Sequence, residues 1–287
     1  MELGILLAFM VAAIKGFQSI YQRKNALGTD EFVTAFSSRA FGIPILLFAL
    51  LLYGIPELGL EFFIYAVPQS LAIAGASIII AKAYKESDAS IVTPMFSLSP
   101  ILLLFTSFFM LGELPDLKGA MGIILITFGA YTLKIKDAKN ILDPVKKLWE
   151  ERGVQLILVV VLLYSVTANI DKIGVKASSP VMWPLTIYTL SSLFMLPVMI
   201  KRSPDWKTKV QKEWKPLAVL GGLGAITIIL QMTAIEITLV SYFVAIKRLS
   251  IPLTVIFSYL LLNEKDSFRE RITGSAIMVI GAILITI

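Results

Sequence analysis

The sequence predicts an all-α integral membrane protein in which ten transmembrane helices form two inverted five-helix repeats. Of its 287 residues, 57% are hydrophobic and only 16% are charged, whereas about 25% of the residues in soluble domains are charged. Apolar runs of about 20 residues, the length of a helix that crosses a bilayer, recur along the whole chain. The two halves of the chain also share an order of proline, glycine and acidic residues.

The composition excludes several classes of protein. The chain has no Cys and no His, which argues against a disulfide scaffold and against sites that depend on those residues, metal sites included. Lys and Arg number 26 against 20 Asp and Glu, an excess that is typical of nucleic-acid binders. The apolar runs assign the chain to the membrane instead. We therefore expect no cofactor, no metal and no nucleic acid, and we expect a small-molecule substrate and the lipid bilayer as partners.

The apolar runs place the ten spans. In the first half they cover residues 3–22, 32–53, 60–81, 89–111 and 117–133, and in the second half 154–170, 181–200, 217–235, 239–262 and 272–287. The period-two alternation of a membrane β-barrel is absent from the sequence. Helices satisfy their own backbone hydrogen bonds, as lipid requires, so the runs predict a helical bundle.

One long polar connection divides the chain. We expect residues 1–136 to form the first repeat and residues 153–287 the second, with 137–152 as an amphipathic connecting loop that carries a short surface helix over 141–149. No secretory signal peptide is predicted, because the first apolar run is too long and no small-residue cleavage site follows it.

The two halves correspond after a shift of 151 or 152 residues. The matched positions in the first half are Pro100, Glu113, Gly122 and Gly129, and in the second half Pro252, Glu264, Gly274 and Gly281. Lys24 and Lys172 are counterparts near the start of each half, 148 residues apart. Because five is odd, the second copy enters the membrane from the opposite face. Inverted repeats of this kind are typical of secondary transporters, whose substrate site lies near the midplane between the repeats.

The basic residues predict the orientation. The loops on one face carry 19 Lys and Arg and those on the other carry 3, namely Lys118, Lys172 and Lys176. The positive-inside rule makes the first face cytoplasmic. The protein is therefore expected to be multi-pass in the cell membrane, with both termini outside the cytoplasm.

Four stretches resemble the EamA-type branch of the drug/metabolite transporter superfamily: residues 90–100, 111–113, 245–252 (AIKRLSIP) and 263–264. The resemblance implies a central cavity lined by spans one to four and six to nine, with spans five and ten at the periphery. It implies alternating access without covalent chemistry, and substrates that include amino acids, other metabolites, drugs and sugars. It also implies cytoplasmic termini, and on this point we follow the opposite prediction from the charge count.

Four cations fall inside predicted spans, namely Lys15, Arg39, Lys247 and Arg248, and all Asp and Glu fall in loops or at span ends. A charge at mid-bilayer costs about 3 kcal/mol on insertion scales. The four cations must therefore face a wet cavity or find partners. With no His and no mid-span carboxylate, the usual proton relay is missing; a buried Lys, substrate exchange and facilitated diffusion remain open.

Helical spacing extends this set of candidates. Lys15, Gln18 and Ser19 follow the i, i+3, i+4 pattern of one helix face. The predicted substrate-binding residues are Lys15, Gln18, Ser19, Arg39, Ser97, Tyr188, Lys247, Arg248 and Ser250. The alternatives are that the serines join helices through hydrogen bonds, that Lys15 and Arg39 snorkel to the interface, and that Tyr188 only packs.

A positive cavity favours a carboxylate-bearing or anionic substrate, such as an amino acid or an organic acid. Arg248 would bind the anion bidentately, and Lys247 would act as a movable charge. The alternatives are an exporter of drugs or other metabolites without anion preference, or a channel. An enzyme is not expected, because paired Asp, a Ser–His pair and a metal site are all missing from the predicted spans. The chain would act as a monomer or a homodimer.

Prolines, acids and glycines complete the expectations. Pro100 and Pro252 lie inside spans four and nine, where each is either a hinge or a kink that only shapes the bundle. Glu113 and Glu264 are interpreted as structural anchors of the turns that follow spans four and nine rather than as ligands, and one way to anchor the turn is to cap the start of span five or ten. The glycines of spans five and ten are expected to let helices pack closely inside each half, with a dimer contact as the alternative.

Overall fold

The computed structural model confirms the predicted fold class. It describes residues 2–25, 28–87, 89–134, 150–262 and 266–287, and every regular element in these ranges is a helix. The first half contains α1 (Glu2–Asn25), α2 (Glu31–Ala40), α3 (Ile43–Tyr53), α4 (Leu60–Glu86), α5 (Ala89–Met95), η1 (Phe96–Leu98), α6 (Ser99–Leu111) and α7 (Leu117–Lys134). The second half contains α9 (Arg152–Lys176), α10 (Met182–Arg202), α11 (Trp206–Lys212), α12 (Trp214–Ile237), α13 (Val240–Lys247), α14 (Ser250–Leu262) and α15 (Asp266–Thr286). The surface helix predicted over 141–149 and the predicted anchor Glu264 lie outside the described residues.

The membrane spans follow the predicted order. Within the described ranges, eight helical segments are long and apolar enough to cross a bilayer, and two shorter apolar helices cover Leu117–Leu133 and Thr273–Thr286. The largest difference from the sequence prediction is in the sixth span, which continues to Lys176 instead of ending at Ile170. This extension brings Asp171 and Lys172 into the bundle.

Three predicted spans are broken into two helices each. Span two turns at Phe41 and Gly42, between α2 and α3. Span four is interrupted by the 3-10 turn η1, and span nine by a short turn between α13 and α14. Pro100 and Pro252 follow the last two breaks, within the first turn of α6 and of α14. An amide N–H has no helical partner in a first turn, so proline is tolerated there. The prolines therefore mark where the second helix of each span begins, and hinge motion at these points stays a prediction.

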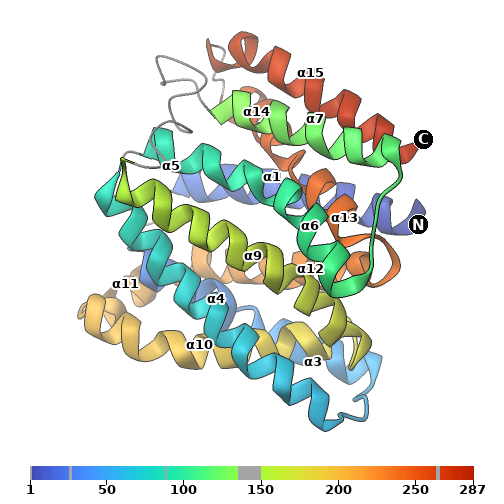
Figure 1. Cartoon of the computed structure of the whole chain (residues 1–287). Coiled ribbons are helices and arrows are strands. Elements are labelled where there is room, and N and C mark those ends of the chain that lie inside the picture. The colour runs from blue at the N-terminus through green and yellow to red at the C-terminus, as the bar shows by residue number, and fades with distance from the viewer. Residues whose placement is uncertain (1, 26–27, 88, 135–149, 263–265) are drawn as a thin grey trace.

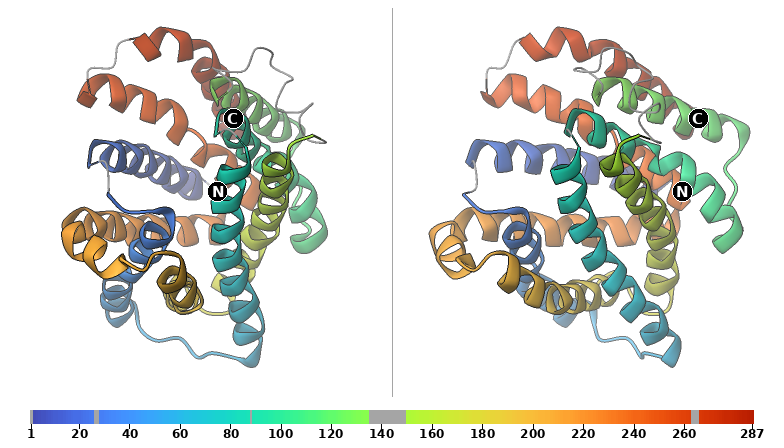
Figure 2. Two further views of the ribbon diagram at one scale, coloured as in Figure 1. Left: turned by 90° about the vertical axis from the view of Figure 1, so that its left-hand side faces the viewer. Right: turned by 60° about the vertical axis from the view of Figure 1, so that its left-hand side comes forward.

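The helices are arranged with both chain termini at one end of the bundle and α11 at the other, as Figure 1 shows. We call these the termini end and the α11 end. Two views in Figure 2 place α7 and α15 side by side along one flank. This agrees with the peripheral position that the family resemblance implies for spans five and ten.

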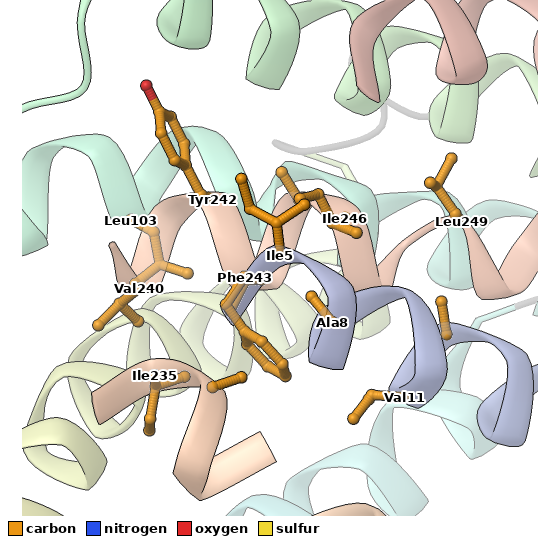
Figure 3. Packing of buried hydrophobic residues seen from close by; sticks show 14 of the residues in the cluster. Ile5, Ala8, Val11, Leu103, Ile235, Val240, Tyr242, Phe243, Ile246 and Leu249 are labelled. Atoms are coloured by element: carbon orange, nitrogen blue, oxygen red, sulfur yellow. The ribbon is translucent and has the colours of Figure 1, made fainter. Parts of the chain in front are cut away.

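The largest hydrophobic core lies between the two halves. Residues Ile5, Ala8 and Val11 form one face of α1, because positions three residues apart lie on the same side of a helix. They pack beside Phe243 and Ile246 of α13 (Figure 3). The first helix of the chain is therefore buried against a helix of the second half, and among the described residues neither half has a separate core of this size.

Glycines bring α7 and α15 into close contact. A Cβ on Gly122 would lie 2.5 Å from the carbonyl oxygen of Gly281, and a Cβ on Gly129 would lie 2.7 Å from that of Gly274. The expectation of close packing inside each half is therefore wrong, because these glycines act between the fifth helix of one half and the fifth helix of the other.

Adding one methyl group at this contact tests its importance. Gly122→Ala is expected to lower the free energy of unfolding by about 1–3 kcal/mol, the usual range for overpacking. Gly75→Ala in α4 is the matched control, because a Cβ there meets nothing within 4 Å. The measurement is thermal unfolding of the detergent-purified protein. Equal midpoints for the two variants would contradict the proposed contact.

Candidate functional site

A central cavity of about 300 Å³ lies between the two halves of the chain. This volume is at the lower end of the range of about 300–1,000 Å³ that is usual for ligand sites, so it suits a small metabolite. Three of the four predicted intramembrane cations line the cavity, namely Arg39, Lys247 and Arg248, and so does the predicted Tyr188. The sequence had placed these residues on three separate spans.

Arg248 lies at the turn between α13 and α14 and reaches the break in span four. Its Nη2 donates to the carbonyl oxygen of Phe96 at 2.8 Å and to the Ser99 hydroxyl. In a continuous α-helix the Phe96 carbonyl would accept from the residue four positions later, which is Pro100 and has no N–H. The Phe96 carbonyl instead accepts the backbone N–H of Ser99 in the 3-10 turn, and Arg248 supplies it with a second donor.

Lys247 makes fewer hydrogen bonds with the protein than Arg248 does. Its Nζ donates to Gln231 Oε1 of α12 at 3.2 Å and lies 5.3 Å from the centre of the Phe243 ring. Both contacts are with uncharged groups. A lysine side chain is a mobile point charge with three donors, so Lys247 retains the capacity to bind an anion in the cavity.

Arg39 connects the central cavity to α4, and Tyr188 connects it to a second cavity. Arg39 donates through Nη1 to the Ala35 carbonyl at 3.1 Å and through Nη2 to the Ser77 hydroxyl of α4 at 3.3 Å. Tyr188 of α10 lines the central cavity and also a second cavity of about 190 Å³. The predicted residues Lys15 and Gln18 line this second cavity, with Gln22 and Thr34. Because these residues lie in the α11-side halves of α1 and α2, the polar surface extends from the centre toward the α11 end.

The remaining predicted residues lie away from both cavities. The Ser19 hydroxyl donates to the Lys15 carbonyl at 3.0 Å, and the Ser250 carbonyl accepts from the Thr254 hydroxyl at 2.7 Å. Ser97 is fully buried in η1, and its hydroxyl has no hydrogen-bond partner among the described residues. None of these three serines therefore lines either cavity.

Asp171 is the charged residue among the cavity residues that the sequence prediction missed, which also include Ser99, Thr167 and Gln231. It lies in α9 and lines the central cavity beside the cations, so the expectation that acids stay outside the spans is wrong at this position. Its Oδ1 accepts from Gln69 Nε2 at 2.9 Å and from Trp183 Nε1 at 2.8 Å. The signal was present in the helical period, because Tyr164, Ala168 and Asp171 follow the i, i+4, i+7 spacing of one helix face and all three line the cavity.

A buried ion pair joins the two halves at the termini end. The side chains of Glu113 and Lys172 are only 13% and 8% exposed, and Lys172 Nζ donates to Glu113 Oε1. Lys172 also donates to the Thr238 carbonyl at 2.7 Å, and the Val240 amide donates to Glu113 Oε2 at 3.0 Å. The helix stop at Gly112, with φ +67, directs Glu113 to this position. Glu113 thus contacts α9 and α13 rather than the start of span five.

The start of α7 is capped by Asp116 instead. Asp116 lies outside the spans and accepts from the Tyr242 hydroxyl at 2.7 Å and from the Gly119 amide at 3.0 Å. The hydrogen bond from Tyr242, followed by that from Gly119, lowers the pKa of the Asp116 carboxyl below its ordinary value. Because Tyr242 belongs to α13, this contact is a second link between the halves at the termini end.

Comparisons with known proteins agree with this architecture. The model of the EamA-like transporter family matches residues 2–134 and 151–287. No curated protein matches the chain. A solved structure described only as the crystal structure of a protein is 16% identical, with a TM-score of 0.75, and the match covers 99% of this chain and 96% of the other. At this identity the likeness supports the fold alone.

The buried pair at the termini end makes a testable prediction. Lys172→Met is expected to lower the free energy of unfolding by about 3–5 kcal/mol, because it leaves the Glu113 carboxylate buried and unpaired. The double variant Glu113→Gln with Lys172→Met should lose less than the two single variants added together. Lys82→Met is the control, since Lys82 pairs with Glu86 at 3.7 Å on the surface and such pairs contribute about 0–1 kcal/mol. If Lys172→Met and Lys82→Met had the same thermal unfolding midpoint, the pair would have no structural role.

Proposed function

The chain belongs to the EamA-like transporter family, and from this premise we propose that it carries a small carboxylate-bearing or otherwise anionic metabolite by alternating access. An amino acid or an organic acid has the required chemistry. The family places the chain among multi-pass membrane transporters of the drug/metabolite superfamily, and the proposal adds the preference for an anion, the mechanism and the location in the cell membrane.

The observation that carries the proposal is the charge of the central cavity. Arg39, Lys247 and Arg248 line it together with one carboxylate, Asp171, so its formal charge is +2. None of these four residues takes part in an ion pair with another described residue. In a region of low dielectric such a cavity attracts negative charge strongly. A carboxylate that binds Lys247 would reduce the net charge and gain charge-assisted hydrogen bonds.

The different contacts at the two ends of the bundle support alternating access. At the termini end, Glu113 and Lys172 tie the halves together through a buried pair. Toward the α11 end, the second cavity continues the polar surface from Tyr188 to Gln22. We propose that this arrangement presents the site to the α11 side, and that the contacts at the termini end separate when the site faces the other side.

Transport in proteoliposomes tests the proposed function. We expect saturable uptake and counterflow with at least one of the labelled probes alanine, glutamate, phenylalanine, lactate and citrate. Lys247→Met should reduce this transport about tenfold or more, because a hydrogen bond to a charged group contributes about 1.5–3 kcal/mol, and Lys247→Arg should retain part of it. Lys207→Met removes the same charge at an exposed position in α11 and serves as the control. Transport without saturation or counterflow would indicate a channel, and full activity of Lys247→Met would reject the anion site.

The orientation that we propose, with both termini outside the cytoplasm, has a direct test. The chain has no Cys, so a single introduced Cys is labelled without background. In intact cells an impermeant maleimide should label Lys118→Cys, at the termini end. It should label Lys207→Cys, at the α11 end, only after the membrane is permeabilised. The reverse pattern would place the termini in the cytoplasm.

A further inference from the structure

The central cavity holds two opposite charges that the protein keeps from pairing with each other. Lys247 Nζ is engaged by Gln231 Oε1 at 3.2 Å. Asp171 Oδ1 is engaged by Gln69 at 2.9 Å and by Trp183 at 2.8 Å. The described ion pairs do not join Asp171 to any cation of the cavity.

One oxygen of Asp171 remains available. Oδ2 takes part in no hydrogen bond among the described residues, and it is not one of the enclosed polar atoms that lack a partner. It therefore keeps its accessible surface in the cavity that Asp171 lines. A carboxylate with one oxygen free inside a membrane span is costly unless a donor or a positive charge comes to it.

The support behind Asp171 is rigid. Trp183 is fully buried, with 0% exposure, and its ring packs edge-on against Phe62 at 5.6 Å. A Cβ at Gly174, one turn from Asp171 on α9, would lie 2.3 Å from the Trp183 ring, so only glycine admits the indole at this position. Gln69 is also buried, and it holds the Thr167 carbonyl at 3.0 Å in addition to Asp171. Packed neighbours thus fix the orientation of the carboxylate, as a binding group requires.

We infer that Asp171 is an acidic subsite for an ammonium group, and that the cargo is a zwitterion with both an amine and a carboxylate. The inference rests on the proposed function, because it assigns the carboxylate of the cargo to the cations of the cavity. The amine would donate to Asp171 Oδ2 while the carboxylate accepts from Lys247. A bound zwitterion satisfies both charges without changing the net charge of the cavity, whereas a simple anion would leave Asp171 Oδ2 without a partner and would be repelled by it.

The test compares ligands that differ only in their charged groups. The detergent-purified full chain is titrated at pH 7 with three matched sets, and its thermal unfolding midpoint is measured. The sets are L-alanine, propionate and ethylamine; L-leucine, 4-methylpentanoate and 3-methylbutylamine; and L-phenylalanine, 3-phenylpropionate and phenethylamine. In at least one set the amino acid should bind at least tenfold more tightly than both partners. The affinities are read from the midpoints, because a ligand that binds the folded state raises the midpoint according to its affinity.

The variant Asp171→Asn should remove the preference of the cavity for the amino acid over the matching carboxylate. It should weaken binding of the amino acid about tenfold or more and leave binding of the matching carboxylate unchanged or tighter, since a repelling charge is removed. A purely structural role of Asp171 would weaken both ligands alike and would overturn the inference. Asp116→Asn makes the same chemical change at the termini end, outside the cavity, and should leave the ratio of affinities unchanged.

The comparison of ligands on the unmodified protein keeps the inference testable if Asp171→Asn does not fold. Equal binding of amino acid and carboxylate in every set would overturn the zwitterion and leave the anion site standing. Equal binding of amino acid and amine, or binding that Lys247→Met does not weaken, would overturn the proposed function itself. Absence of binding in all three sets would overturn the inference.

Discussion

The bond from Arg248 to the Phe96 carbonyl, at 2.8 Å, is the interaction on which the centre of the bundle depends. Lipid offers no partners to backbone groups, so a break in a membrane helix survives only where the protein supplies them. Each half has such a break: η1 in the first half, and the turn at Arg248 in the second. Position 248 follows position 96 by 152 residues, the same shift that relates Pro100 to Pro252. The two breaks therefore correspond to each other, and Arg248 at one of them adds a side-chain donor to the Phe96 carbonyl at the other, which also accepts the Ser99 N–H.

This contact divides the cations of the cavity into two kinds. Arg248 donates to the Phe96 carbonyl and the Ser99 hydroxyl of the first half. Arg39 donates to the Ala35 carbonyl of its own helix and to the Ser77 hydroxyl of α4. They contribute fixed positive charge and hold the walls of the cavity in place. Lys247 has only an amide oxygen and an aromatic ring as neighbours, so it can exchange the amide for a charged ligand at small cost. The substrate contact that we propose therefore rests on the lysine, while the adjacent arginine maintains the geometry.

The halves are joined differently along the flank and at the termini end. Along the flank, α7 and α15 pack backbone to backbone at Gly122 and Gly281. Glycine has no side chain, and each of these two glycines faces the carbonyl oxygen of the other. No side chain lies between the two backbones at this point that could move and let one helix shift against the other. At the termini end the halves are held by side chains, including the pair Glu113 and Lys172, which can separate without breaking a helix. A rigid flank beside side-chain contacts at the end suits a transporter in which the inner helices move and the fifth helices remain together.

The sequence by itself determined the number and order of the spans, the correspondence of the halves and the four intramembrane cations. These follow from length, hydropathy and residue type, which are local properties, and three of the cations do line the cavity. Only the tertiary structure decided which groups meet. The apolar run ends at Ile170, yet α9 continues to Lys176, because Lys172 finds Glu113 and Asp171 finds Gln69 and Trp183. These partners lie on other segments of the chain, and the order of residues in the sequence does not show which segments will meet.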